Sequence, residues 1–141
     1  MEEKKAAVQM RDITKRFGPV LANDRVWLDI YKGEILALLG ENGSGKTTLM
    51  NMLSGIYFPD EGQIFINGKE VLIRSPKDAF SYGIGMIHQH FKLVDVLTAA
   101  ENIVLGLKEP GRLDMNKVAA KVKQICDAYG FDVDPNQKIY N

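Results

Sequence analysis

Residues 40–47 read Gly40-Glu41-Asn42-Gly43-Ser44-Gly45-Lys46-Thr47, and they directly follow the apolar run Ile35-Leu36-Ala37-Leu38-Leu39. The octet fits the pattern G-x-x-x-x-G-K-[ST], which sets two glycines, a lysine and a hydroxyl side chain at fixed intervals. An apolar run without alternation is typical of a strand that is covered on both faces, as in a parallel sheet. Lys46–Ser54 then has the pattern of a helix that ends at Gly55. Strand, glycine-rich loop and helix in this order predict an α/β fold.

Phosphate chemistry gives each fixed position of the octet a reason. Gly43 and Gly45 have no Cβ atom, so the backbone can adopt positive φ and wrap closely around an anion. Backbone N–H groups then converge at a helix N-terminus, where the dipole also favours negative charge. Lys46 supplies charge to the β- and γ-phosphates, the Thr47 hydroxyl ligates Mg²⁺, and Thr48 adds a hydroxyl for the α-phosphate. The predicted nucleotide-binding residues of the loop are Asn42, Gly43, Ser44, Gly45, Lys46, Thr47 and Thr48. The sequence therefore predicts a site for ATP with Mg²⁺.

The bulk composition is that of an ordinary globular chain about one domain long. Of its 141 residues, 45% are hydrophobic, and 18 basic side chains balance 18 acidic ones. A nucleic-acid-binding protein would be expected to carry a basic surplus, so we expect no nucleic acid partner. No apolar run approaches the roughly 20 residues that span a bilayer. The single cysteine, Cys126, agrees with a reducing compartment, and we expect a cytoplasmic location.

Several other elements can be predicted around the octet. The Asn67-Gly68 pair predicts a tight hairpin, Ser75-Pro76 predicts a capped helix start, and Thr98 with Glu101 has capping-box spacing. The expected strands are Val8–Thr14, Val26–Tyr31, Glu34–Leu39, Gln63–Ile66, Lys69–Ile73 and Ile84–His88. The expected helices are Lys46–Ser54, a short one from Pro76 to Gly83, one from Thr98 to about Leu107, and one from Asp114 to Gly130. The apolar stripe of the last helix comprises Val118, Val122, Ile125, Cys126 and Tyr129.

Several segments of this sequence resemble the sequences of ATP-binding subunits of ABC transporters. The run from Lys32 to Leu49 (KGEILALLGENGSGKTTL) carries the likeness, and Leu53–Gly62 follows in the family's order. Ile13–Gly18 is similar to the family's A-loop, whose aromatic residue stacks on adenine. Phe17 is the matching residue, and an aromatic ring suits any purine face. The resemblance thus implies that Phe17 belongs to the nucleotide site.

Downstream, Ile84–Gln89 resembles the strand that enters the family's Q-loop. Leu97–Ile103 resembles the family's T-V-x-E-N-I segment, the last of these matching stretches. The resemblance implies that Gln89 reaches the metal and the γ-phosphate and links the nucleotide to the membrane subunit. Lys46 and Gln89 are then the catalytic candidates, and Thr47 and Gln89 the metal ligands. His88–Val94 (HQHFKLV) is most like bacterial importers of sugars and nucleosides, in which one polypeptide carries two ATPase domains.

The resemblance implies a P-loop ATPase core with an N-terminal antiparallel β subdomain, over residues 1–95, and the beginning of an α-helical subdomain, over 96–141. The expected partners are transmembrane permease subunits, contacted through the Q-loop region, and a second ATPase domain. The expected location is the inner face of the cell membrane.

The 141 residues contain no signature loop, no apolar strand that ends in an Asp-Glu pair and no switch histidine. We therefore interpret them as an N-terminal part of the ATPase that binds ATP but hardly hydrolyses it. Other functions remain open at this point. They are a non-transporter ABC ATPase, a nucleotide-binding regulatory module, and a P-loop kinase or GTPase, although the guanine-reading Asn-Lys-x-Asp is absent.

Overall fold

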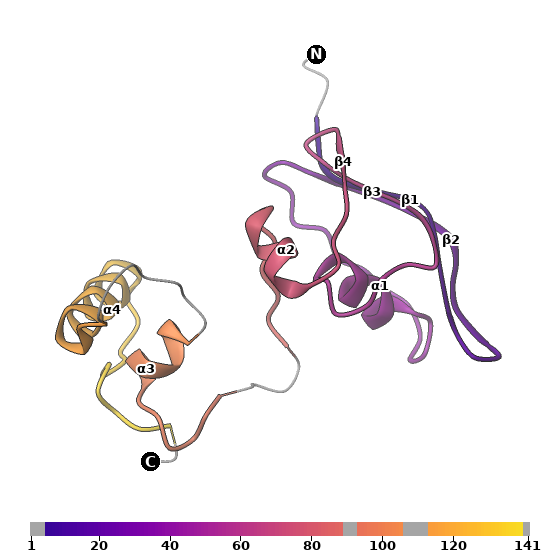
Figure 1. Ribbon diagram of the computed structural model, residues 1–141. Helices are drawn as coiled ribbons and strands as arrows, with labels where there is room; N and C mark the ends of the chain where they lie inside the picture. The colour runs from indigo at the N-terminus through magenta and orange to yellow at the C-terminus, as the bar shows by residue number, and fades with distance from the viewer. Residues whose placement is uncertain (1–4, 89–92, 106–112, 140–141) are drawn as a thin grey trace. The chain divides into compact units, whose positions relative to one another are not determined.

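The computed structural model describes residues 5–88, 93–105 and 113–139. The chain divides into two compact units, Met1–Met86 (unit 1) and Ile87–Asn141 (unit 2). Figure 1 labels the helices and strands of both units along the chain.

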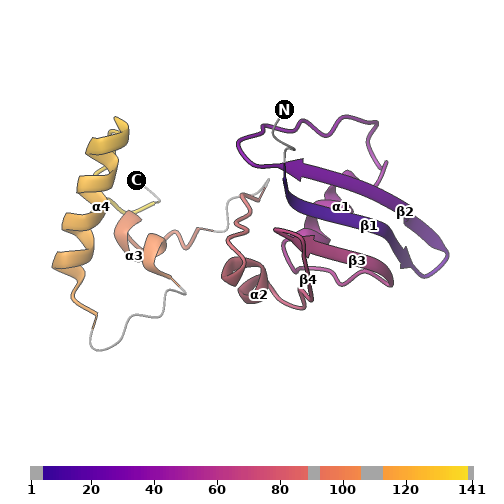
Figure 2. The same ribbon diagram turned by 90° about the horizontal axis from the view of Figure 1, so that it is seen from above.

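Unit 1 is built on a four-stranded antiparallel sheet. Its strands are β1 (Ala6–Phe17), β2 (Val20–Tyr31), β3 (Glu61–Ile66) and β4 (Lys69–Val71), in the order β2-β1-β3-β4. Figure 2 shows these strands side by side. The strands predicted at Val8–Thr14, Val26–Tyr31 and Gln63–Ile66 are confirmed and are longer than expected, whereas the one predicted at Lys69–Ile73 ends at Val71. The predicted Asn67-Gly68 hairpin is also confirmed, because both residues have the positive φ values, 51° and 79°, that a type I′ turn requires.

A bulge in β1 explains how two side chains at odd spacing reach the same core. Met10 pairs with Leu28 and Ile13 with Val26, so β1 has one residue more than β2 between these pairs. Asp12 takes up the extra residue with a φ of 52°. Met10 and Ile13 consequently face the same side, and both are completely buried.

Two helices pack against this face of the sheet. They are α1 (Lys46–Leu53) and α2 (Pro76–Ser81). α1 ends within one residue of its predicted end, and Ser75 caps α2 as predicted by accepting a hydrogen bond from the Asp78 N–H. The core of unit 1 comprises Met10, Ile13, Leu49, Met52, Leu53, Ile64, Ile66, Val71, Ile73 and Ala79. It joins the antiparallel sheet to the helix that follows the glycine-rich loop.

The two strands predicted at Glu34–Leu39 and Ile84–His88 are wrong for this structure, which has no strand in either segment. Ile35 is fully exposed, and Leu39 and Ile87 are 89% and 88% exposed. A β-strand exists only by hydrogen bonding to a neighbour, and no described segment pairs with either run. Both runs have the apolar composition of buried segments, but the described part of the chain leaves much of their apolar surface exposed.

Unit 2 contains α3 (Ala99–Val104) and α4 (Met115–Tyr129). α4 begins and ends as predicted, with Asp114 as its N-cap and Gly130, at a φ of 71°, as its C-cap. The predicted capping box at α3 is confirmed, but the helix ends at Val104, before the predicted Leu107, which lies outside the described residues.

The small core of unit 2 comprises Ala100, Val122 and Cys126. Ile125 and Tyr129 of the predicted stripe are 49% and 74% exposed, which corrects that part of the prediction. Within the described part of unit 2, α4 packs on only one other helix, so its buried face is narrower than its apolar face.

Protonation of Glu101 is expected to weaken the start of α3. The Glu101 carboxylate accepts a hydrogen bond of 2.7 Å from the Thr98 N–H, and the Thr98 hydroxyl accepts one of 3.2 Å from the Glu101 N–H. The Thr98 N–H chiefly, and its hydroxyl next, hold the pKa of Glu101 below its ordinary value of 4.5. Because the folded pKa is the lower one, this stabilisation is present above pH 4.5 and is lost as the pH falls through the folded pKa.

We expect Glu101→Gln to lower the stability of unit 2 at pH 7, and the difference from wild type to close as the pH falls below 4.5. Urea denaturation followed through the amide resonances of α3 measures this difference. Asp95→Asn, at an exposed residue of unit 2, is the control. A difference that stays constant from pH 7 to pH 3 would show that the Glu101 charge has no part in the cap.

Candidate functional site

The glycine-rich loop is exposed and leads into the N-terminus of α1. The Ser44 N–H donates to the Glu41 carbonyl at 3.2 Å, and this turn directs the chain toward the helix. Gly45 is the N-cap residue with a φ of 83°, and the Leu49 N–H donates to its carbonyl at 2.9 Å. The first N–H groups of a helix have no carbonyl partner within it, so those of Lys46 and the residues after it are available to an anion. Asn42, Gly43, Ser44 and Thr47 are exposed, whereas Thr48 is half-buried.

The Lys46 ammonium group curls back over this loop. Its Nζ atom donates to the carbonyl oxygens of Gly40 and Glu41, both at 2.7 Å, and lies 3.2 Å from the Ser44 hydroxyl. All three acceptors are neutral, whereas a phosphate oxygen carries a negative charge that adds direct Coulomb attraction to the ammonium group. A phosphate oxygen would therefore compete effectively for this ammonium group.

Gly45 lies against β2 in a space that no larger residue fits. A Cβ atom built on Gly45 would lie 2.2 Å from the Ala22 carbonyl oxygen and 2.8 Å from Asn23 Nδ2. Asn23 is 6% exposed, and its Nδ2 donates to the Gly45 carbonyl at 3.3 Å. Its Oδ1 atom is buried without a hydrogen-bond partner among the described residues. Asn23 was not predicted as a site residue, because nothing in its local pattern distinguishes it from any polar residue of a half-buried strand.

Phe17 lies at the end of the β1–β2 hairpin and is 41% exposed. Its ring and that of Tyr57 form a T-shaped pair, with centroids 5.1 Å apart and planes at 69°, and Lys15 Nζ lies 5.6 Å from the Phe17 ring centroid. Asp60 holds the same segment, because it accepts hydrogen bonds from Lys15 Nζ at 2.8 Å and from the Arg16 N–H at 2.7 Å. These two donors, Lys15 first, hold the pKa of the Asp60 carboxyl below its usual range. Nothing in the sequence around Asp60 indicates these two donors, because both lie more than 40 residues away.

Gln89 and its neighbours up to Lys92 lie outside the described residues, so the structure does not report on the predicted Q-loop glutamine. Within the described ranges, no group of three or more His, Cys, Asp or Glu side chains could hold a metal ion. Thr47, in the first turn of α1, is thus the predicted Mg²⁺ ligand whose position the structure describes. A threonine hydroxyl with phosphate oxygens and water is a donor set that suits Mg²⁺.

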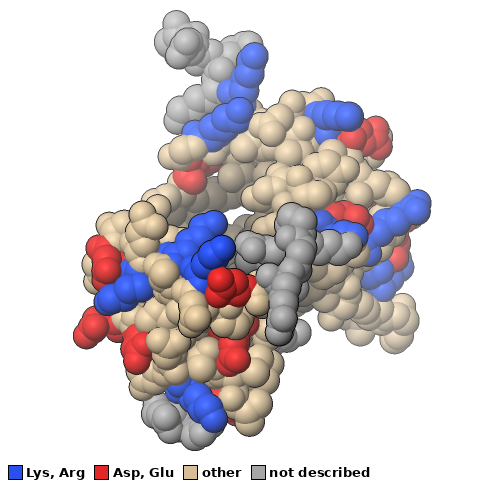
Figure 3. Space-filling view, turned by 60° about the vertical axis from the view of Figure 1, so that its left-hand side comes forward, with Lys and Arg blue, Asp and Glu red and all other residues tan. Residues whose placement is uncertain are grey.

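The charges of the described residues are mixed on the face shown in Figure 3, where lysine and arginine side chains alternate with aspartate and glutamate. The whole sequence has a formal net charge of zero. Among the helices that the structure describes, none is long and apolar enough to cross a membrane.

The chain is similar to known proteins over most of its length. The family model described as ABC transporter matches residues 23–141. The guanosine import ATP-binding protein NupO of Bacillus subtilis is 51% identical over 93% of this chain and 26% of the relative. The nucleoside import ATP-binding protein NupA of Lactococcus lactis is 50% identical over 94% of this chain and 26% of the relative. The chain therefore spans about a quarter of the length of these relatives.

Solved structures of ATP-binding cassettes are also similar to this chain. A nucleotide-free ATP-binding cassette from an ABC transporter superposes with a TM-score of 0.79 at 26% identity, covering 96% of this chain and 58% of that one. A cassette in its ADP conformation matches with the same TM-score and coverage at 25% identity.

Proposed function

This chain belongs to the ABC transporter family of ATP-binding proteins, and we propose that it forms the nucleotide-binding part of an ATPase that drives import of nucleosides or sugars. The observation that carries the proposal is the Lys46 ammonium group held over a glycine-rich loop at the N-terminus of α1. The two relatives are named for guanosine and nucleoside import, which supports the nucleoside part of the proposed substrate class.

In this proposal the triphosphate binds across the loop and the start of α1. Backbone N–H groups between Asn42 and Thr48 surround the phosphate oxygens, and Gly45 lets the end of the loop lie directly against β2. Lys46 exchanges its neutral loop acceptors for β- and γ-phosphate oxygens. When bound, Mg²⁺ neutralises charge on the β- and γ-phosphates, and the Thr47 hydroxyl is among its ligands. Phe17 stacks on the adenine ring, and as a residue it is 41% exposed.

The proposal also covers Gln89, which the structure does not describe, the division of the chain into subdomains, and the partner proteins. Gln89 contacts the metal and the γ-phosphate and transmits the state of the nucleotide to transmembrane permease subunits. Residues 1–95 form the ATP-binding core with its antiparallel β subdomain, and residues 96–141 begin the α-helical subdomain. A second ATPase domain pairs with this one at the cytoplasmic face of the membrane. The whole ATPase hydrolyses ATP to reset the transporter.

These 141 residues on their own are expected to bind Mg·ATP and to hydrolyse it negligibly. Hydrolysis needs a group that orients the attacking water, and the sequence has no acidic pair at the end of an apolar strand to do so. Calorimetric titration and phosphate release should be measured on the same sample. Binding with turnover far below the order of 1 per second, the low end for enzymes, agrees with the proposal. Turnover at that rate or above would contradict this part of it.

A further inference from the structure

Two residues of the loop between α1 and β3 fasten the segment that carries Phe17. Building on the function proposed above, we propose that Tyr57 and Asp60 are positioning residues for the purine base of the nucleotide. They hold Phe17 in the orientation that receives the base. Tyr57 and Asp60 both precede β3, whereas Phe17 ends β1, so the contact joins parts of the chain about 40 residues apart.

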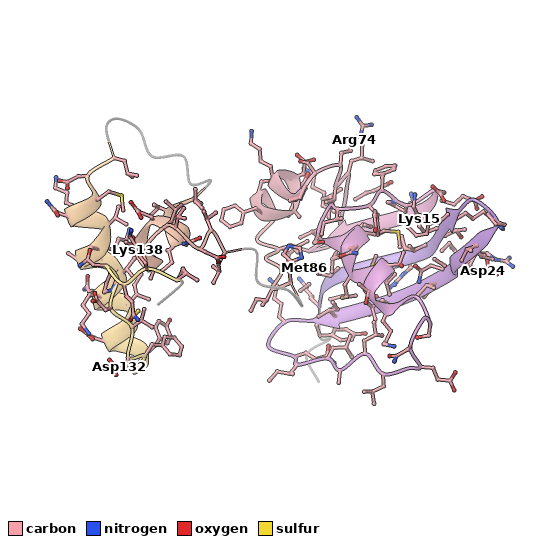
Figure 4. All side chains as sticks on the ribbon, turned by 90° about the horizontal axis from the view of Figure 1, so that it is seen from below. Lys15, Asp24, Arg74, Met86, Asp132 and Lys138 are labelled. Carbon is pink, nitrogen blue, oxygen red and sulfur yellow. The ribbon has the colours of Figure 1, made fainter. Side chains whose placement is uncertain are left out.

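Asp60 fixes the backbone next to Phe17. Its Oδ1 accepts from Lys15 Nζ and its Oδ2 from the Arg16 N–H, so both carboxylate oxygens bind the two residues that immediately precede Phe17. The Asp60 N–H also donates to the Thr14 carbonyl at 2.9 Å. Three hydrogen bonds thus tie one residue to the segment 14–16. Figure 4 labels Lys15, whose side chain reaches this carboxylate from β1.

Tyr57 fixes the ring of Phe17 itself. The edge-to-face contact at 5.1 Å and 69° is the geometry that aromatic pairs prefer. The Tyr57 N–H donates to the Asn51 carbonyl at 3.2 Å, so the tyrosine is attached to the end of α1. Since α1 begins at the phosphate-binding loop, one short helix connects that loop to the ring that would receive the base.

The contacts leave part of the Phe17 ring free while restricting its motion. Tyr57 and Lys15 Nζ, at 5.1 Å and 5.6 Å from the ring centroid, are the described contacts of the ring, and Phe17 as a residue remains 41% exposed. A ring already held in place loses little conformational freedom when a base stacks on it, and preorganisation of this kind raises affinity. The benefit applies only to ligands that carry a base. The positioning role therefore predicts a base-dependent effect, which a purely structural role would not produce.

The test compares two ligands on the full chain, Mg·ATP and magnesium tripolyphosphate, which has the phosphates without a base. We expect Phe17→Ala to weaken Mg·ATP binding about tenfold, the order of one base–aromatic stack, and to leave tripolyphosphate affinity unchanged. Tyr57→Ala and Asp60→Asn should each weaken Mg·ATP roughly threefold to tenfold with the same selectivity. Tyr57→Phe keeps the ring and should keep the affinity.

Matched control variants are Tyr82→Ala, since Tyr82 is 41% exposed and Tyr57 37%, and Asp24→Asn, at an exposed aspartate of β2. Neither should change the ratio of the two affinities. Equal weakening of both ligands by Tyr57→Ala and Asp60→Asn, or no weakening of either, would overturn the inference and leave the proposed function intact. If the unaltered chain binds neither ligand, the proposed function itself fails.

Discussion

Lys46→Ala is expected to lower the affinity for Mg·ATP by about a hundredfold. The Lys46 ammonium group is the positive charge that the structure places over the phosphate-binding loop, within 2.7 Å of two loop carbonyls. Hydrogen bonds to charged groups are worth about 1.5–3 kcal/mol each, and a tenfold change in affinity corresponds to about 1.4 kcal/mol. Loss of its contacts to two phosphates therefore accounts for a change of this order. Calorimetric titration of both proteins with Mg·ATP measures it.

The control for this prediction is Lys32→Ala, at an exposed lysine in the turn after β2. It removes the same charge from unit 1 but should leave the affinity unchanged. The melting temperature of Lys46→Ala should stay close to that of wild type, because its partners are exposed loop atoms. Equal affinities for Lys46→Ala and Lys32→Ala would mean that the nucleotide does not bind at this loop.

Gly45→Ala is expected to destabilise unit 1 strongly and to abolish nucleotide binding. The residue has a φ of 83°, and an added Cβ would lie 2.2 Å from the Ala22 carbonyl oxygen, a backbone atom that can move only with β2. A left-handed residue costs roughly 1–2 kcal/mol and an overpacked core site roughly 1–3 kcal/mol, so a loss of several kcal/mol follows. Urea denaturation gives the stability, and titration with Mg·ATP gives the affinity.

Gly33→Ala separates the two causes. Gly33 has a φ of 71°, but a Cβ atom there would meet nothing within 4 Å. This variant should therefore show only the conformational cost of roughly 1–2 kcal/mol, with nucleotide affinity retained. If Gly45→Ala were no more destabilising than Gly33→Ala, the close approach of the loop to β2 would not be a constraint on the site.

Local signals predicted much of this structure correctly. The capping residues Ser75, Thr98 and Asp114 act through hydrogen bonds within a few residues, so sequence alone locates them. The same holds for the Asn67-Gly68 turn, which depends on backbone preference. The likeness to solved ATP-binding cassettes confirms the fold class that the octet and its neighbours indicated.

Features that depend on distant partners were predicted less well. The run 35–39 has the composition of a buried strand, but pairing requires a neighbour that its own residues do not specify. Asn23 and Asp60 gain their roles from Gly45 and from Lys15 with Arg16, which are 22 to 45 residues away. No periodicity encodes such contacts.

The most direct test of the account follows the backbone amide resonances of the full chain during titration with Mg·ATP. We expect the largest shifts on residues 42–48, with a second, base-dependent group around Phe17, and we expect Lys46→Ala to move both groups to about hundredfold higher Mg·ATP concentrations. Shifts confined to unit 2, or shifts at 42–48 that persist unchanged in Lys46→Ala, would contradict it.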